Sequence, residues 1–107
     1  MAEAIADIRS LTSAKNEDDY LGDRLLRRAV ERCLEIVSEA SRSLSADDKA
    51  DYPAIPWRGI ADFGNVLRHA YGSVSDRRVW SVVVDDLPNL EAAVMELIQR
   101  HQRDLAP

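Results

Sequence analysis

Apolar residues recur at intervals of three and four along most of the chain, which is the period of helices that bury one face. No segment shows the sustained alternation of apolar and polar residues that is typical of a half-buried strand, and the β-branched run at residues 82–84 lies inside a longer helical pattern. Polar breaks divide the pattern into four helices, expected at residues 2–14, 18–44, 57–71 and from about 76 to about 100. The sequence therefore predicts an all-α protein, an up-and-down four-helix bundle with long second and fourth helices.

The second predicted helix carries apolar residues on two sides. One row steps by three and four, as a buried face does, and comprises Leu21, Leu25, Ala29, Cys33, Ile36 and Ala40. A second row widens this stripe and comprises Leu26, Val30, Leu34 and Val37. The helix is therefore expected to contact neighbours on two sides. Because its apolar width exceeds what one small core needs, the sequence also predicts a homodimer.

The fourth predicted helix has an apolar seam interrupted by a proline. The seam comprises Trp80, Val83, Leu87, Leu90, Val94 and Leu97. Pro88 lacks a backbone N–H and clashes with the preceding turn, so it must kink or split the helix near residues 85–87. Elsewhere, residues 45–56 contain two prolines three apart and are expected to form a loop, and the polar tail from residue 101 is expected to fray.

Length and charge limit what the chain can do. Its 107 residues suffice for one domain, residues 1–107, with a single core. A net charge of −5 repels nucleic acid overall, so any RNA site must be a local basic patch. The sequence shows no signal peptide and no apolar stretch near the roughly 20 residues that a membrane span needs. We therefore expect a protein that does not enter a membrane.

The cysteine and the histidines carry little chemistry of their own. Cys33, the one cysteine, can form no internal disulfide and lies among apolar residues, as is typical of a protein of the reducing cytoplasm. The two histidines, His69 and His101, lie far apart in the sequence, with no cysteine pair to join them. We expect neither a metal nor another cofactor.

A basic stripe runs along the second predicted helix. Its members step by three and four and are Arg24, Arg27, Arg28 and Arg32. Such a stripe is usually a solvated, salt-bridged face, and Glu31 and Glu35 lie near enough to pair with it. Arginine's planar fork also suits bidentate contact with phosphate, so a phosphate backbone is the other ligand that the stripe could attract.

The end of the third predicted helix gathers groups that act on a phosphate or a proton. Asn65 lies beside Arg68 and His69 on the helix surface, because residues three and four apart are neighbours there. Tyr71 follows His69 where Gly72 is expected to end the helix. Gly64, in mid-helix, costs about 1 kcal/mol relative to alanine, which points to close approach of another helix or of a ligand. From the residues alone, the group is either a catalytic site or a satisfied polar patch between helices.

Several segments together resemble the HepT-like proteins of the HEPN superfamily, which are small all-helical partners in bacterial and archaeal toxin–antitoxin pairs. The resemblance covers roughly residues 20–100. In chain order, the segments that carry it are Arg28 to Ala40, Ile55-Pro56-Trp57-Arg58-Gly59-Ile60, Asn65-Val66-Leu67-Arg68-His69-Ala70-Tyr71, Val79-Trp80 and Asp86-Leu87-Pro88-Asn89-Leu90.

This resemblance implies a metal-independent RNA endonuclease that acts as the toxin of such a pair. Family members form homodimers in which two copies of an Arg-Asn-x3-His-x-Tyr motif face a shared cleft. The RNA 2′-hydroxyl attacks the adjacent phosphate, and the motif histidine, here His69, acts as general acid or base with a pKa suited to neutral pH. The antitoxin of the pair is a minimal nucleotidyltransferase that adenylylates the motif tyrosine, here Tyr71.

The chain departs from the family motif at one position. Aligning Asn65, His69 and Tyr71 with the motif places Gly64 where the arginine should stand, and Arg68 is the nearest cation that could replace it. Two further interpretations therefore stay open. The chain could be a non-catalytic module that binds a nucleotidyltransferase partner, with His69 and Tyr71 as contact or modification sites, or a helical protein that binds a nucleotide.

Overall fold

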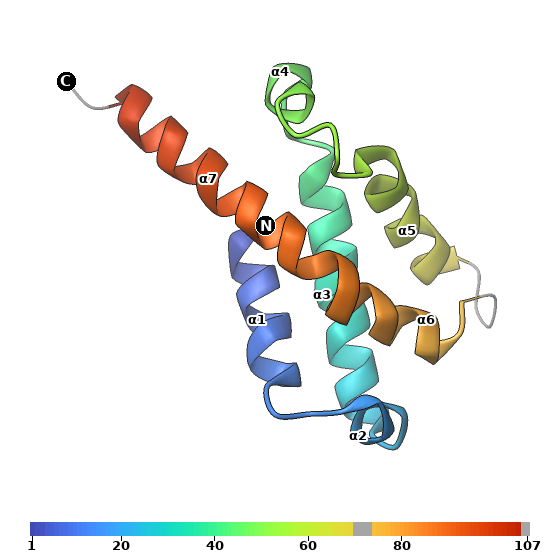
Figure 1. Ribbon diagram of the computed structural model, residues 1–107. Coiled ribbons are helices and arrows are strands. Elements are labelled where there is room, and N and C mark those ends of the chain that lie inside the picture. The colour runs from blue at the N-terminus through green and yellow to red at the C-terminus, as the bar shows by residue number, and fades with distance from the viewer. Residues whose placement is uncertain (70–73, 106–107) are drawn as a thin grey trace.

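The computed structural model describes residues 1–69 and 74–105, and of His69 the backbone alone. Within these ranges the secondary structure is entirely helical (Figure 1). The elements are α1 (Ala2–Thr12), α2 (Glu17–Leu21), α3 (Arg24–Ser41), α4 (Ala46–Ala50), α5 (Trp57–His69), α6 (Asp76–Ser81), a π-helical turn (Val82–Asp86) and α7 (Leu87–Leu105). The prediction of an all-α bundle is confirmed.

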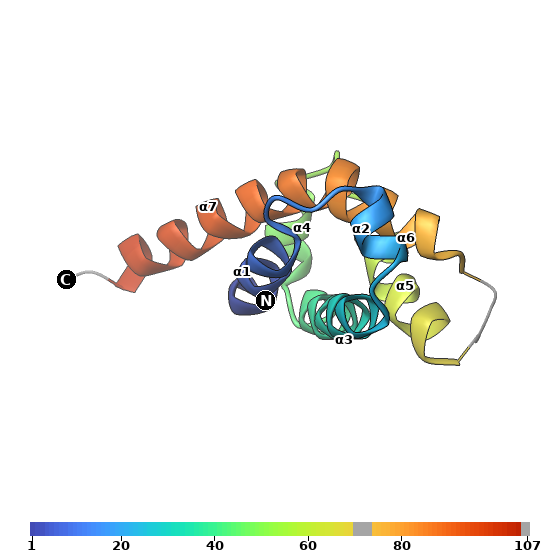
Figure 2. The same ribbon diagram turned by 90° about the horizontal axis from the view of Figure 1, so that it is seen from below.

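Helix α3 is the centre of the bundle. It packs against α1 on one side and against α5 on the other, and α7 crosses α1 (Figures 1 and 2). In the view from below, α3 lies between α1 and α5, and the second half of α7 extends away from the other long helices (Figure 2). The position of α5, which carries most of the candidate site, therefore depends mainly on its contact with α3.

The second predicted helix is in fact two helices, so the prediction of one helix over residues 18–44 was wrong. Helix α2 ends at Gly22, and α3 restarts with Asp23 as its N-cap, where the carboxylate accepts a hydrogen bond from the Leu26 N–H at 3.0 Å. Asn16 and Asp19 form a capping box at the start of α2. These caps satisfy the free backbone groups of two helix ends, which makes the break stable.

The apolar row expected to form the buried face of α3 is mostly at its edge. Leu25 is 72% exposed and Ile36 is 41% exposed. The second row is the one that enters the core; its buried members are Leu26, Val30, Leu34 and Val37. They meet Ala4, Ile5 and Ile8 of α1 and the seam of the last helices, of which Val83, Leu87, Leu90, Val94 and Leu97 are buried. The seam prediction is confirmed, and α3 keeps apolar side chains on its outer surface.

The proline prediction is also confirmed, with a specific geometry. The chain makes a π-helical turn over Val82–Asp86 just before Pro88, and the Leu87 N–H donates to the Val82 carbonyl, five residues back. A proline cannot supply the N–H that the α-helical ladder needs and crowds the preceding turn, so a wider turn lets the helix continue without ending.

Two further expectations, for the 45–56 segment and for the C-terminal tail, were wrong. The 45–56 segment is not all loop, because Ser45 caps the short helix α4. The tail is helical through Leu105, and two pairs join α7 to the α4 region: Arg100 Nη1 lies 2.6 Å from Asp51 Oδ2, and His101 Nε2 lies 3.0 Å from Asp48 Oδ2. The hydrogen bond with His101 lowers the pKa of Asp48. Long-range ion pairs, which the local sequence pattern does not show, therefore order this end.

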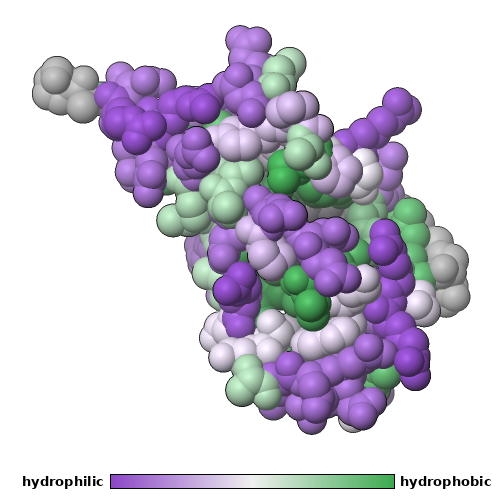
Figure 3. Space-filling model, in the orientation of Figure 1, coloured by the Kyte–Doolittle hydropathy of each residue, from purple (hydrophilic) through white to green (hydrophobic). Residues whose placement is uncertain are grey.

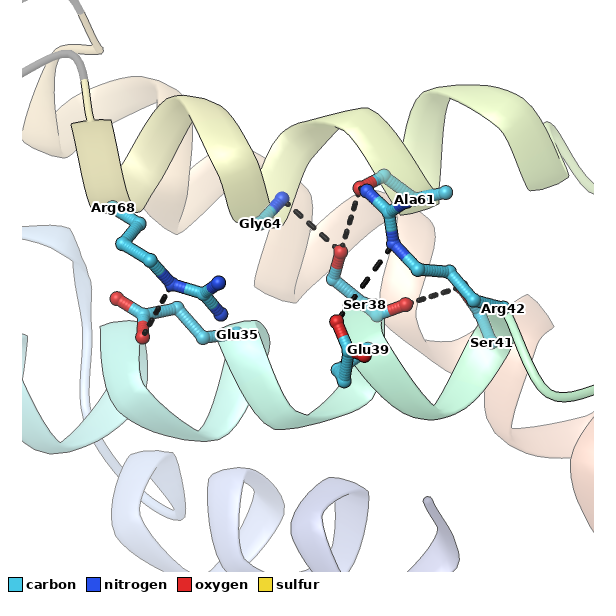
Figure 4. Close-up of polar contacts among 8 residues, drawn as sticks. All are labelled: Glu35, Ser38, Glu39, Ser41, Arg42, Ala61, Gly64 and Arg68. Carbon is cyan, nitrogen blue, oxygen red and sulfur yellow. Dashed lines mark hydrogen bonds and ion pairs between the residues drawn. The ribbon is translucent and has the colours of Figure 1, made fainter.

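Helix α5 approaches α3 most closely at Gly64 (Figure 4). The Ser38 hydroxyl, 3% exposed, donates to the Ala61 carbonyl at 2.9 Å and accepts from the Gly64 N–H at 3.2 Å. The guanidinium of Arg42 donates to the same Ala61 carbonyl at 2.8 Å. A Cβ on Gly64 would lie 2.6 Å from the Ser38 Cβ, which is far inside van der Waals contact. The glycine is therefore required by helix packing.

Gly64→Ala should lower the free energy of unfolding by about 1–3 kcal/mol, because the new methyl group overpacks the contact with Ser38. Gly59→Ala is the matched control on the same helix, since a Cβ there meets only the Pro56 Cβ, at 3.9 Å. That control should be neutral or stabilising by up to about 1 kcal/mol, as alanine is the better helix former. Urea denaturation of both variants measures the difference, and equal stabilities would contradict the close contact.

Candidate active site

The candidate site begins at the last turns of α5. Asn65 and Arg68 lie on this helix and are exposed. The helix ends at His69, of which the backbone is described. The side chain of His69 and all of Tyr71 lie outside the described residues. The structure therefore places Asn65, Arg68 and the end of the helix, and the roles of His69 and Tyr71 stay predictions.

Arg68 lies one turn beyond Gly64 on the side of α5 that faces α3. Its Nε is 4.0 Å from Oε2 of Glu35 (Figure 4). The same carboxylate pairs with Arg32 Nη1 at 3.2 Å. The side chain of Arg68 is 44% exposed. A long, partly exposed ion pair of this kind contributes little to stability, so the guanidinium can turn to another anion at small cost.

A polar cleft of about 650 Å³ opens between α3, the end of α5 and the start of α6. Helix α3 continues toward α2 beyond the level at which α5 ends (Figure 1). The charged residues that line the cleft are Arg24, Arg27, Arg28, Glu31, Glu35, Arg68 and Asp76. Four arginines and three carboxylates leave one net positive charge in a chain whose total is −5. The cleft is thus a local basic patch of the kind that an RNA site would need.

Two arginines of the α3 stripe have ion-pair partners among the described residues, and two do not. Arg27 donates to the Leu21 carbonyl and lies 3.5 Å from Asp76, and Arg32 pairs with Glu35, so both take part in structural contacts. Arg24 and Arg28 are exposed, and no carboxylate of the described residues lies within ion-pair distance of either. The salt-bridged interpretation therefore holds for half of the stripe, and the other half is open to an anion.

The inner wall of the cleft is acidic and partly desolvated. Burial, followed by repulsion from Asp76, raises the pKa of Glu31. Tyr20 lies behind this wall, fully buried with its ring 5.3 Å from that of Trp80, and burial also raises the pKa of its phenol. Tyr20 belongs to the core, and sequence analysis did not single it out because its burial depends on the contact between α2 and α6.

A second hollow of about 310 Å³ lies between α3, α5 and the last helices. Its walls are mainly apolar, with Ile60, Phe63, Val82 and Leu87 among them. Figure 3 shows hydrophobic side chains gathered in small areas of this face, within a polar surround. Arg68 lines the polar cleft and not this hollow, and Asn65 lines neither of them.

The described residues contain neither a candidate metal site nor a candidate membrane span. Within residues 1–69 and 74–105, no three histidine, cysteine, aspartate or glutamate side chains gather in a way that could hold a metal ion. Over the same ranges, no helix is both long and apolar enough to cross a membrane. The cleft presents four arginines and three carboxylates beside the end of α5, and its exposed arginines can bind an anion.

Comparison with models of protein families identifies the family of the chain. The model of the family described as "Ribonuclease HepT-like" matches residues 1–97. The chain belongs to the HepT-like ribonuclease family. Its resemblance to HepT-like proteins, inferred from the sequence motifs, is therefore confirmed.

Individual HepT-like relatives are similar over most of their length. A protein of Thermococcus cleftensis named "Probable ribonuclease HepT" is 39% identical over 97 residues, which cover 91% of this chain and 88% of the relative. "Putative RNase MJ0127" of Methanocaldococcus jannaschii is 32% identical over 91% of this chain and 80% of its own length. "Putative RNase TTE0752" of Caldanaerobacter subterraneus subsp. tengcongensis is 33% identical over 79% and 76%. No solved structure matches the chain.

Glu31→Gln should stabilise this HepT-like fold at neutral pH. Because the pKa of Glu31 is raised on folding, its protonated form favours the fold, and that stability is lost as the pH rises through the folded-state pKa. The variant keeps the neutral form at every pH, so its denaturation midpoint should exceed that of the wild type at pH 7 and match it below about pH 4. Glu39→Gln, at an exposed position 3.8 Å from Arg42, is the control and should give no gain. A pH-independent gain would contradict the assignment.

Proposed function

We propose that this chain is a metal-independent RNA endonuclease and the toxin of a toxin–antitoxin pair. One observation carries the proposal: Arg68, next to His69 in the chain, lies in the last turn of α5 and lines the cleft that the α3 arginines also line. Membership of a ribonuclease family supports RNA as the substrate. The local positive charge supports the same substrate in a chain that is otherwise acidic.

The reaction is a transesterification in which the RNA 2′-hydroxyl attacks the adjacent phosphate. The 2′-oxygen forms a new bond to phosphorus and loses its proton to a base, while the bond to the 5′-oxygen breaks and that oxygen takes a proton from an acid. The products are a 2′,3′-cyclic phosphate and a free 5′-hydroxyl. Histidine suits both proton transfers, because its unperturbed pKa lies near neutrality. In a homodimer, His69 of each copy supplies one of the two roles.

Arg68 takes the role of the family arginine, which Gly64 cannot fill. Positions 64 and 68 are one turn apart, about 6 Å along the axis, and share the face of α5 that meets α3. The Arg68 guanidinium then stabilises the charge that develops on the phosphorane. The amide of Asn65 donates to a phosphate oxygen and helps to orient it.

A homodimer would bring two such motifs together. The exposed apolar side chains of α3, Leu25 and Ile36, support it, as does the 37% exposed Val66 beside the motif on α5. All three leave apolar area in water unless another surface covers it.

The partner of the pair would be a minimal nucleotidyltransferase that adenylylates Tyr71. A nucleotide on that residue adds negative charge and bulk two residues from His69, and both oppose the approach of an RNA phosphate. The alternative is a non-catalytic module that docks the same partner or a nucleotide. The absence of an arginine at position 64 favours this alternative, and the cations of the cleft favour the nuclease.

His69→Ala should reduce RNA cleavage by about 10²–10⁴-fold, since it removes the proton-transfer group. His101→Ala is the matched control, because that histidine pairs with Asp48 at the far end of α7, and its cleavage rate should equal that of the wild type. Arg68→Ala should lose about 10²-fold or more. EDTA should have no effect on the wild type. A nuclease that is insensitive to His69→Ala, or inactivated by EDTA, would contradict this mechanism.

Tyr71→Phe should escape neutralisation by the cognate nucleotidyltransferase. Incubation of the wild type with that enzyme and ATP should add one or more adenylyl groups at residue 71 and abolish cleavage, while the Phe variant stays unmodified and active. Peptide mass mapping and the cleavage assay measure the two effects. Modification at another residue, or full neutralisation of the Phe variant, would count against Tyr71 as the regulatory point.

A further inference from the structure

Two arginines of α3 remain without a structural function in the cleft. Arg24 and Arg28 are exposed, line the same cleft as Arg68, and have no carboxylate of the described residues within ion-pair distance. Their neighbour Arg27 differs, because it is held by the Leu21 carbonyl and by Asp76. The cleft thus contains, in addition to Arg68, two arginines that form no ion pair among the described residues, although the charge of Arg28 acts on the nearby Glu31.

The spacing of this pair fits a strand of phosphates. Arg24 and Arg28 are one helical turn apart, so they lie on one face of α3 and about 6 Å apart along its axis. That separation is comparable with the distance between successive phosphates of a nucleic-acid strand. Arg28 is also two turns from Glu35, about 10 Å along α3. Arg68 lies beside Glu35, with its Nε 4.0 Å from the carboxylate. Glu31 lies on the same face between Arg28 and Glu35, so the two arginines form a cationic site that two carboxylates separate from Arg68.

We propose that Arg24 and Arg28 bind the phosphate backbone of the RNA strand next to the scissile phosphate. They bind consecutive phosphates along α3, while Arg68 acts at the phosphate that reacts. This binding site deepens the proposed nuclease function and rests on it for the identity of the ligand as RNA. It also explains how an acidic chain without the family arginine retains RNA: the positive charge is distributed along α3.

The arrangement of charge on α3 supports a phosphate backbone over an acidic protein partner. Arginine binds phosphate through a planar fork, and both arginines lie along one helix face in a cleft that also holds Arg68 and adjoins Asn65 through Val66. Glu31 lies on α3 one turn beyond Arg28, and Asp76 begins α6; both carboxylates repel an anion and favour its binding at the end of the face that carries Arg24 and Arg28. An RNA strand would therefore run along α3.

The test is binding of a fluorescent single-stranded RNA with 2′-O-methyl groups, which the enzyme cannot cleave, at several salt concentrations. Arg24→Gln/Arg28→Gln should raise the Kd about tenfold or more at low salt. The double variant should also reduce the slope of log K against log salt by about 1.4, because each lost phosphate contact contributes about 0.7 for a single strand. Lys15→Gln/Arg103→Gln removes the same charge from exposed positions outside the cleft and should change the Kd less than twofold. Glu31→Gln should tighten binding.

The outcomes separate this proposal from the function on which it rests. If the wild type binds RNA through Arg24 and Arg28 but does not cleave it, the nuclease proposal fails and the binding site stands. If the wild type cleaves RNA while the cleft variant binds it like the control variant, the binding site is overturned and the nuclease stands. Wild type that neither binds nor cleaves RNA overturns both. Unchanged RNA binding with loss of a nucleotidyltransferase complex would assign the two arginines to that partner and overturn the proposal. Circular dichroism of each variant confirms that it is folded.

Discussion

The contact between Gly64 and Ser38 positions α5 on α3, and the candidate site at the end of α5 depends on it. Ser38 bonds to the backbone of α5 at two points, and the space that a side chain at position 64 would need is filled by Ser38 itself. Helix α5 has few other close neighbours, so this contact fixes its height and rotation on α3. The end of α5, where the motif lies, is positioned by a residue with no side chain.

The same contact has a chemical consequence. The family arginine cannot stand at position 64 while Ser38 occupies that space, so the cation for the phosphate must come from another position. Arg68 follows one turn later on the same face, and α3 contributes Arg24 and Arg28 to the cleft beyond the end of α5. Acidic residues in the same cleft limit its net charge to +1. Because contacts between cations and phosphates supply most of the affinity for RNA, a cleft with this modest net charge is expected to bind RNA weakly.

Local residue patterns predicted most of the helices and part of the candidate site. The helical periods, the effect of Pro88 and the need for close approach at Gly64 are each local consequences of residue type. The break at Gly22 was missed because a capping residue, Asp23, follows inside a continuous apolar pattern. Which apolar row of α3 enters the core, and which arginines are paired, depend on partners distant in the sequence, such as Asp76 for Arg27. Periodicity cannot reveal such partners. The roles of His69 and Tyr71 rest on the family motif.

The most direct test of the account is a crystal structure of the protein with a 2′-O-methyl RNA dinucleotide or longer strand bound. We expect a phosphate within about 3 Å of the Arg68 guanidinium, beside His69, with the strand continuing along α3 past Arg28. Ser38 should keep its hydrogen bonds to the backbone at Ala61 and Gly64. A phosphate bound away from Arg68, or a strand that avoids α3, would contradict the account.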